Sequence, residues 1–140
     1  MSAIFLNPNP KSEIVNIYIM AESNILGNKG EDLAADYLKK AGYKILMRNW
    51  TWGKHEIDII AEKAEMLVFI EVKTRSGNPQ MHPRTSITVE KQKSIIYAAD
   101  GYIQKFKVDK ESRFDLLFII MDGDQPQFEL IDDAFYPTLR

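Results

Sequence analysis

Apolar residues recur at helical spacing in two stretches of the chain. The first lies at about residues 28–41, where an apolar residue returns every three or four positions: Leu33, Ala34, Tyr37, Leu38 and Ala41. Gly42 follows, and glycine at this place is a common helix stop. The second begins after Thr88, whose side chain suits an N-cap. Its apolar face carries Ile95, Ala99, Tyr102, Ile103 and Phe106. The pattern predicts two helices.

Three strand-like segments follow the first predicted helix. Each is rich in β-branched, aromatic or other apolar residues, and short polar turns separate them. The segments cover roughly residues 43–50, 55–61 and 66–74, and the turns cover residues 51–54 and 62–65. Because such short turns join neighbouring strands, we expect an antiparallel meander.

The C-terminal part of the chain predicts two further strands. Apolar runs at residues 114–121 and 127–131 flank Asp122-Gly123-Asp124, which has the composition of a hairpin turn. Residues 77–83 contain Asn-Pro and His-Pro and are predicted to form a loop. The order of elements is helix, three strands, helix and two strands. It predicts an α/β fold with a mixed central sheet flanked by helices.

The first residues of the chain do not resemble a secretion signal. They lack a basic start and contain two prolines and two charged residues where a signal peptide needs an apolar stretch. We expect residues 1–23 to be a loose N-terminal extension, with Met20 as the functional start, and residues 24–140 to form one domain. The alternative is a short strand at residues 14–19 that pairs with a sheet edge.

Composition narrows the possible classes of protein. The chain has 140 residues, of which 45% are hydrophobic and 27% charged, as in an ordinary globular domain. Its formal charge of -2 means that any anion-binding surface must be local. The absence of cysteine excludes disulfides and thiolate sites and permits a reducing compartment. No stretch approaches the roughly 20 apolar residues of a membrane-spanning helix. We expect a cytoplasmic protein without a membrane partner.

Two charged residues lie in the third strand-like segment, which is otherwise largely apolar. Residues two apart in a strand point to the same side, so Glu71 and Lys73 project together. Burying such charges is costly unless they pair or hold an ion. The segment therefore predicts either a salt bridge at the end of the strand or an ion-binding site.

The preceding strand repeats this pattern, with Glu56 and Asp58 on one face and isoleucines on the other. If the two strands pair through the turn at residues 62–65, Asp58 and Glu71 lie nearly opposite one another and can contact one cation. Two carboxylates, completed by waters and a phosphate oxygen, form a common Mg²⁺ site. The alternative is a solvated polar face, but the apolar flanks of the strand argue against it.

Lys73 would complete such a site. A metal held by two carboxylates can lower the pKa of water, orient a phosphate and neutralise charge in the transition state. The lysine ammonium could position or help to deprotonate the attacking water, or stabilise the phosphate. The sequence does not choose among these roles.

Basic residues gather next to the predicted site. Between residues 73 and 93 there are five lysines and arginines and one acid, whereas acidic residues crowd the C-terminal part. A basic edge beside an acidic metal site suits a polyanion such as nucleic acid. Arg75 and Lys91 are the best candidates for phosphate contacts. The alternative for each is a surface charge that serves solubility.

The aromatic and histidine residues near the predicted site are not expected to take part in its chemistry. Trp50 and Trp52 could stack on bases, but aromatic residues beside a strand turn more often pack. His55 and His82 lack the spacing of zinc ligands, and we expect both to lie at the surface.

Four segments of the chain together resemble the YraN-like family of bacterial proteins. They span residues 30–38, 48–50, 56–61 and 69–75, and the resemblance covers about residues 24–120. This family is similar to a branch of the restriction-endonuclease-like superfamily, the PD-(D/E)XK nucleases, with archaeal Holliday-junction resolvases as structural relatives. The resemblance therefore implies a restriction-endonuclease-like core.

The resemblance also implies roles for four residues. Asp58 and Glu71 would be catalytic metal ligands, Lys73 the catalytic lysine, and Glu31 an additional catalytic acid that faces the metal. The implied cofactor is Mg²⁺ or Mn²⁺. The chain departs from the family pattern at His55, where a glycine is usual, and it has Ile57 in place of the proline of the superfamily name. Neither change removes a ligand.

These observations lead to a metal-dependent nuclease that hydrolyses phosphodiester bonds of DNA, with branched DNA as one substrate. We expect a homodimer, because a nuclease this small needs a second site to cut both strands. The alternative is a non-catalytic nucleic-acid-binding or scaffolding protein that keeps the fold, in which the charged residues form a structural ion pair. A small-molecule phosphohydrolase is less favoured because no pocket signature is present.

Overall fold

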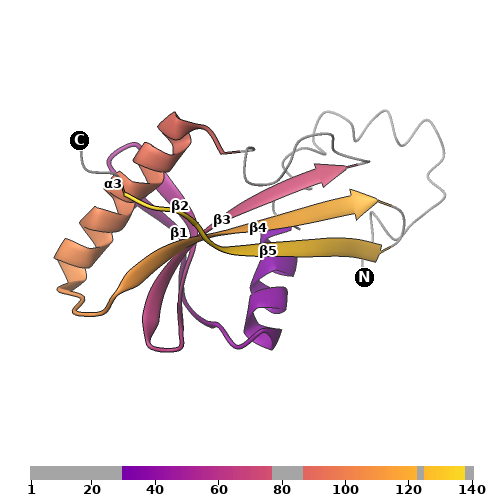
Figure 1. Ribbon diagram of the computed structural model, residues 1–140, viewed down its shortest axis with the longest axis horizontal. Helices are drawn as coiled ribbons and strands as arrows, with labels where there is room; N and C mark the ends of the chain where they lie inside the picture. Colours follow the sequence, from indigo (N-terminus) through magenta and orange to yellow (C-terminus); the bar gives the residue numbers. More distant parts are fainter. Residues whose placement is uncertain (1–29, 77–86, 123–124, 138–140) are drawn as a thin grey trace.

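A five-stranded sheet lies at the centre of the structure, with a helix packed on each face (Figure 1). The structure is a computed structural model and describes residues 30–76, 87–122 and 125–137. Its elements, in chain order, are a helix at residues 30–40, β1 (Lys44–Trp52), β2 (His55–Lys63), β3 (Met66–Ser76), α3 (Val89–Phe106), β4 (Ser112–Asp122) and β5 (Gln125–Phe135).

The strands lie in the sheet in chain order, β1-β2-β3-β4-β5. β3 and β4 are parallel, and α3 connects them, whereas all other neighbours are antiparallel. The predicted meander of the first three strands is therefore confirmed. The predicted hairpin of the last two strands is confirmed as well, because Asp122 pairs with Gln125 across the turn. The protein has a mixed α/β fold.

Both predicted helices form, and local residues define their ends. Gly42 follows the helix at residues 30–40 with a φ of 96°, a conformation that glycine adopts without steric cost. Thr88 is the N-cap of α3, since its Oγ1 accepts a hydrogen bond from the backbone N–H of Lys91 at 3.0 Å. Phe106, predicted on the buried face, is 47% exposed because it is the last residue of α3.

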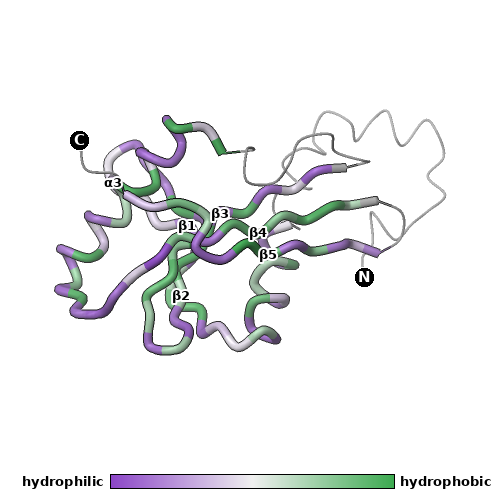
Figure 2. Tube along the Cα trace, in the orientation of Figure 1, coloured by the Kyte–Doolittle hydropathy of each residue, from purple (hydrophilic) through white to green (hydrophobic). Residues whose placement is uncertain are grey.

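The two faces of the sheet carry separate apolar clusters. Side chains alternate along β2, so that Ile59 and Ala61 pack with Leu38 of the helix at residues 30–40, and Ile60 packs with Ile95 of α3. Figure 2 shows that β4 is hydrophobic along most of its length, whereas the last part of β3 is hydrophilic. The central strands thus form the core, and β3 carries polar groups at its end.

The two tryptophans pack as predicted. Trp50 and Trp52 stack on each other with ring centroids 5.9 Å apart, and Trp50 Nε1 donates a hydrogen bond to the carbonyl oxygen of Ala98 in α3. His55, expected at the surface, is half-buried against α3, where its Nδ1 lies 2.7 Å from Ser94 Oγ. These contacts anchor the β1–β2 hairpin to α3.

Several predictions lie outside the described residues. They are the N-terminal extension over residues 1–23, the start at Met20, the strand at 14–19, the loop at 77–83 and the surface position of His82. In the part of the chain that the structure describes, no helix has the length and apolar character needed to cross a membrane.

Candidate metal centre

The ladder between β2 and β3 ends before either strand does. Its last pair is Ile59 with Ile70, although β2 begins at His55 and β3 continues to Ser76. Beyond this pair, β3 remains bonded to β4 along its whole length. The next residues on the two strands are Asp58 and Glu71, so the predicted carboxylates lie where the two strands stop pairing.

The Asp58 side chain gives a backbone N–H of β3 the hydrogen-bond acceptor that β2 no longer provides there. Its Oδ2 accepts a hydrogen bond from the backbone N–H of Val72 at 2.8 Å. This bond fixes the carboxylate against β3, one residue from Glu71. The expectation that Asp58 and Glu71 lie close together across the two strands is therefore confirmed.

Glu71 is buried, with 5% of its surface exposed, and two lysines approach it. Lys73 Nζ lies 3.8 Å and Lys91 Nζ 3.6 Å from its Oε2. Glu71 Oε1 is also buried, and no group of the described residues donates a hydrogen bond to it. The predicted contact between Glu71 and Lys73 is present, but one carboxylate oxygen remains for another ligand or a proton.

Burial shapes the acidity of both carboxyl groups. Burial, and then the nearby charge of Asp58, raise the pKa of Glu71 to about 7, although Lys91 and Lys73 lower it in part. Burial also raises the pKa of Asp58, against the lowering effect of the Val72 N–H and the two lysines. Because the buried Glu71 carboxylate and the half-buried Asp58 carboxylate repel each other, the pair favours binding a proton or a cation.

Glu31 lies near this pair at the beginning of the helix at residues 30–40. The helix approaches β3 closely here, since a Cβ at Gly30 would be 2.4 Å from Thr74 Oγ1. Partial burial and the charge of Asp58 raise the pKa of Glu31, and a hydrogen bond with the Asn49 side chain lowers it. The helix start is thus held beside the carboxylate pair.

A direct metal contact by Glu31 stays a prediction. Within residues 30–76, 87–122 and 125–137, no group of three or more His, Asp or Glu side chains is arranged to hold a metal ion. A cation would therefore rest on Asp58 and Glu71, with water and substrate as its other ligands.

The two predicted phosphate contacts differ in position. Lys91 lies beside the carboxylate pair, with its Nζ in contact with Glu71. Arg75 is exposed further along β3, where its Nη1 donates to the carbonyl oxygen of Thr74 and its guanidinium lies 5.9 Å from the Phe118 ring. Contact of either residue with phosphate stays a prediction.

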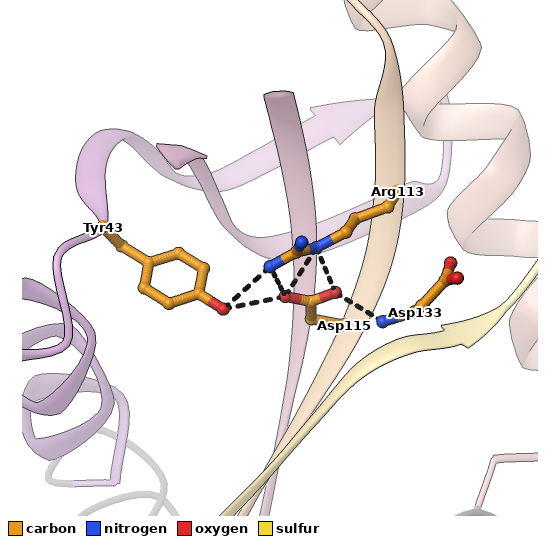
Figure 3. A network of polar contacts seen from close by, with 4 residues as sticks. All are labelled: Tyr43, Arg113, Asp115 and Asp133. Atoms are coloured by element: carbon orange, nitrogen blue, oxygen red, sulfur yellow. Dashed lines mark hydrogen bonds and ion pairs between the residues drawn. The ribbon is translucent and has the colours of Figure 1, made fainter. Parts of the chain in front are cut away.

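A second buried carboxylate was missed by the sequence analysis (Figure 3). Asp115 is completely buried in β4. Its oxygens accept hydrogen bonds from Tyr43 Oη at 3.0 Å, from Arg113 Nε at 3.0 Å and from the backbone N–H of Asp133 at 2.9 Å. The signal was present, since Asp115 interrupts an apolar run just as Glu71 does.

This network is structural. It holds an irregularity between β4 and β5, where the register shifts between Phe114 and Leu116 and Asp133 has a φ of 54°. Tyr43 belongs to the apolar cluster beneath the helix at residues 30–40, whereas α3, which carries Lys91, packs on the other face of the sheet. The buried charge of Asp115 is matched by Arg113, and its oxygens are bonded.

Comparisons with known proteins place the site within a matched region. The model of the uncharacterised protein family UPF0102 matches residues 30–119. This range includes Glu31, Asp58, Glu71, Lys73 and Lys91. A UPF0102 protein of Bacteroides fragilis is 43% identical over 120 residues, covering 86% of this chain and 99% of the relative. A UPF0102 protein of Flavobacterium johnsoniae is 43% identical over 121 residues, covering 84% and 98%.

A third relative matches over a shorter stretch. A UPF0102 protein of Chlorobium phaeobacteroides is 43% identical over 102 residues, covering 72% of this chain and 80% of the relative. These matches confirm the resemblance to YraN-like proteins that the sequence motifs predicted. The chain belongs to the uncharacterised protein family UPF0102.

Proposed function

We propose that the protein is a divalent-metal-dependent nuclease that hydrolyses phosphodiester bonds of DNA, with a core of the restriction-endonuclease-like, PD-(D/E)XK, type. One observation carries the proposal. Asp58, Glu71 and Lys73 come together where β2 and β3 stop pairing. Acidic groups next to a lysine at an open place in a sheet suit phosphoryl transfer better than a structural role, because burying them is costly.

The residues present fit a divalent cation. Asp58 and Glu71 offer carboxylate oxygens, the donors that Mg²⁺ and Mn²⁺ prefer. In the part of the chain that the structure describes, the buried Glu71 Oε1 has no hydrogen-bond partner, and a cation would satisfy it. A bound cation would supply neutralisation of phosphate charge and activation of water.

The protein's own side chains have distinct tasks in this proposal. The Val72 N–H orients the Asp58 carboxylate. Burial keeps bulk water away from Glu71, which strengthens its interactions with charged partners. The Lys73 side chain is 22% exposed, so its ammonium can face both Glu71 and an entering phosphate. From there it can hold the attacking water or stabilise charge on the phosphate.

A second candidate function rests on the same contacts. Two ammonium groups already approach Glu71, which is also what a structural ion cluster would show. A nucleic-acid-binding or scaffolding protein without catalysis would fit this arrangement. In that case, replacing Lys73 would lower stability and would leave no cleavage activity to lose.

The test is cleavage of labelled duplex, single-stranded and four-way-junction DNA with Mg²⁺, Mn²⁺ or chelator. Asp58→Asn and Lys73→Ala are compared with Asp36→Asn and Lys39→Ala, which change exposed residues of the helix at residues 30–40. We expect cleavage that requires metal, is lost in the first pair of variants and is kept in the second. Cleavage that survives in folded Asp58→Asn, or no cleavage of any DNA by the wild type, would refute the nuclease and favour the binding protein.

A further inference from the structure

Lys91 brings a second ammonium to the carboxylate pair from a different element of the fold. Lys73 reaches Glu71 from the same strand, whereas Lys91 belongs to the first turn of α3. Its Nζ is 3.6 Å from Glu71 Oε2, slightly closer than the Nζ of Lys73 at 3.8 Å. The position of α3 therefore determines the charge balance of the site.

Helix stability does not explain a lysine at this position. Thr88 caps α3, and the third residue after such a cap is commonly Glu or Gln, whose side chain reaches back to the cap. Here that residue is Lys91. A cation in the first turn also lies at the positive end of the helix dipole, which is unfavourable. The lysine is placed there at a cost to the helix, which points to a role at Glu71.

The contact between Lys91 and Glu71 joins opposite charges but is geometrically loose. Burial raises the pKa values of Asp58 and Glu71, and of the two ammonium groups that lower them, Lys91 has the larger effect. Yet 3.6 Å is longer than the roughly 2.7–2.9 Å of a charge-assisted hydrogen bond. The Lys91 side chain is also 40% exposed, so its ammonium can leave Glu71 without losing hydration.

We propose that Lys91 is a phosphate-binding residue of the metal centre that neutralises Glu71 until a divalent cation replaces it there, and then binds a phosphate oxygen of the nucleic acid. This inference rests on the proposed function. It assigns to α3 a task separate from that of Lys73. Lys73 on β3 stays beside the reacting phosphate. Lys91 on α3 leaves Glu71 and binds a phosphate oxygen of the substrate.

The proposal makes opposite predictions for two ligands. Removing the Lys91 charge takes away repulsion against the cation, so Lys91→Gln should bind Mn²⁺ at least about fivefold more tightly. The same variant should bind DNA about tenfold more weakly in Ca²⁺, with a slope of log affinity against log salt reduced by about one. Lys91→Arg keeps the charge and should retain most of the DNA affinity. A lysine that only stabilised the fold would not shift the two affinities in opposite directions.

Calorimetric Mn²⁺ titrations and DNA binding at several KCl concentrations test this, with Lys105→Ala in the last turn of α3 as the matched control. Unchanged Mn²⁺ affinity in Lys91→Gln would overturn the proposal. Tighter Mn²⁺ binding with unchanged DNA affinity would overturn it too, because Lys91 would then act on Glu71 alone. Asp58→Asn is titrated in parallel. If it binds Mn²⁺ as the wild type does, the metal centre itself is refuted, whatever Lys91 does.

Discussion

Replacing Glu71 by glutamine should make the metal-free protein more stable at alkaline pH. The carboxyl group is buried beside Asp58, and its pKa is raised to about 7 from an ordinary value of 4.5. Glutamine has nearly the same shape as the protonated acid but cannot ionise. The variant therefore keeps the packing of the neutral form and removes the cost of a buried charge.

The sign follows from proton linkage. Between pH 4.5 and about 7 the folded protein holds a proton on Glu71 that the unfolded chain has released. The stability due to this proton is complete below the unfolded pKa and is lost as the pH rises through the folded pKa. A pKa raised from 4.5 to about 7 corresponds to at most about 3 kcal/mol. The free energy of unfolding of the wild type should thus fall relative to Glu71→Gln by up to this amount.

Urea denaturation in chelator at pH 5, 6, 7 and 8 measures this difference. We expect the smallest difference at pH 5, a growing advantage of Glu71→Gln up to pH 7, and little further change at pH 8. Glu129→Gln, at an exposed position in β5, is the control and should follow the wild type at every pH. A difference between wild type and Glu71→Gln that does not change from pH 5 to pH 8 would refute the reasoning. Added Mn²⁺ should stabilise the wild type and not the variant.

The remaining predictions concern the packing of α3 and the buried polar network of Asp115, and urea denaturation at pH 7 measures all of them. Gly101→Ala places a Cβ 2.4 Å from the Trp52 ring, so we expect a loss of about 1–3 kcal/mol. A gain, usual when alanine replaces a helix glycine, would contradict this packing. Asp115→Asn should cost about 3–5 kcal/mol, because Arg113 loses its buried counter-charge. Tyr43→Phe should cost about 0.5–1.5 kcal/mol, since Asp115 keeps its other donors. Equal losses in Asp115→Asn and Tyr43→Phe would refute the prediction that losing the counter-charge costs more than losing one hydrogen bond.

Local pattern was sufficient to predict most of the fold. Period-two alternation and short turns located the strands, because one-residue steps in a strand change the face of the sheet. The same alternation placed Glu71 and Lys73 on one side. A short turn after β2 was predicted too, and the structure places it at residues 64–65, with the register that brings Asp58 beside Glu71. These relations depend on neighbours in sequence, so the sequence contains them.

Tertiary contacts were beyond the reach of such patterns. That Lys91 contacts Glu71 depends on where α3 lies on the sheet, and no periodicity within α3 expresses it. Two partners of Asp115, Tyr43 and Asp133, come from other segments of the chain, whereas Arg113 lies two residues away on the same strand. The end of the β2–β3 ladder after Ile59 was also unpredicted, because both strands remain strand-like in composition beyond it.

The end of this ladder is what allows a charged site within a hydrophobic sheet. Where β2 and β3 stop pairing, backbone groups need other partners, and Asp58 supplies one to Val72. The two carboxylates and the two lysines, with all four groups ionised, carry no net formal charge. Adding a divalent cation makes the cluster positive, and a phosphodiester is the kind of anion that would balance it. Metal and nucleic acid should therefore favour each other's binding, and by linkage each should raise the affinity of the other by the same factor.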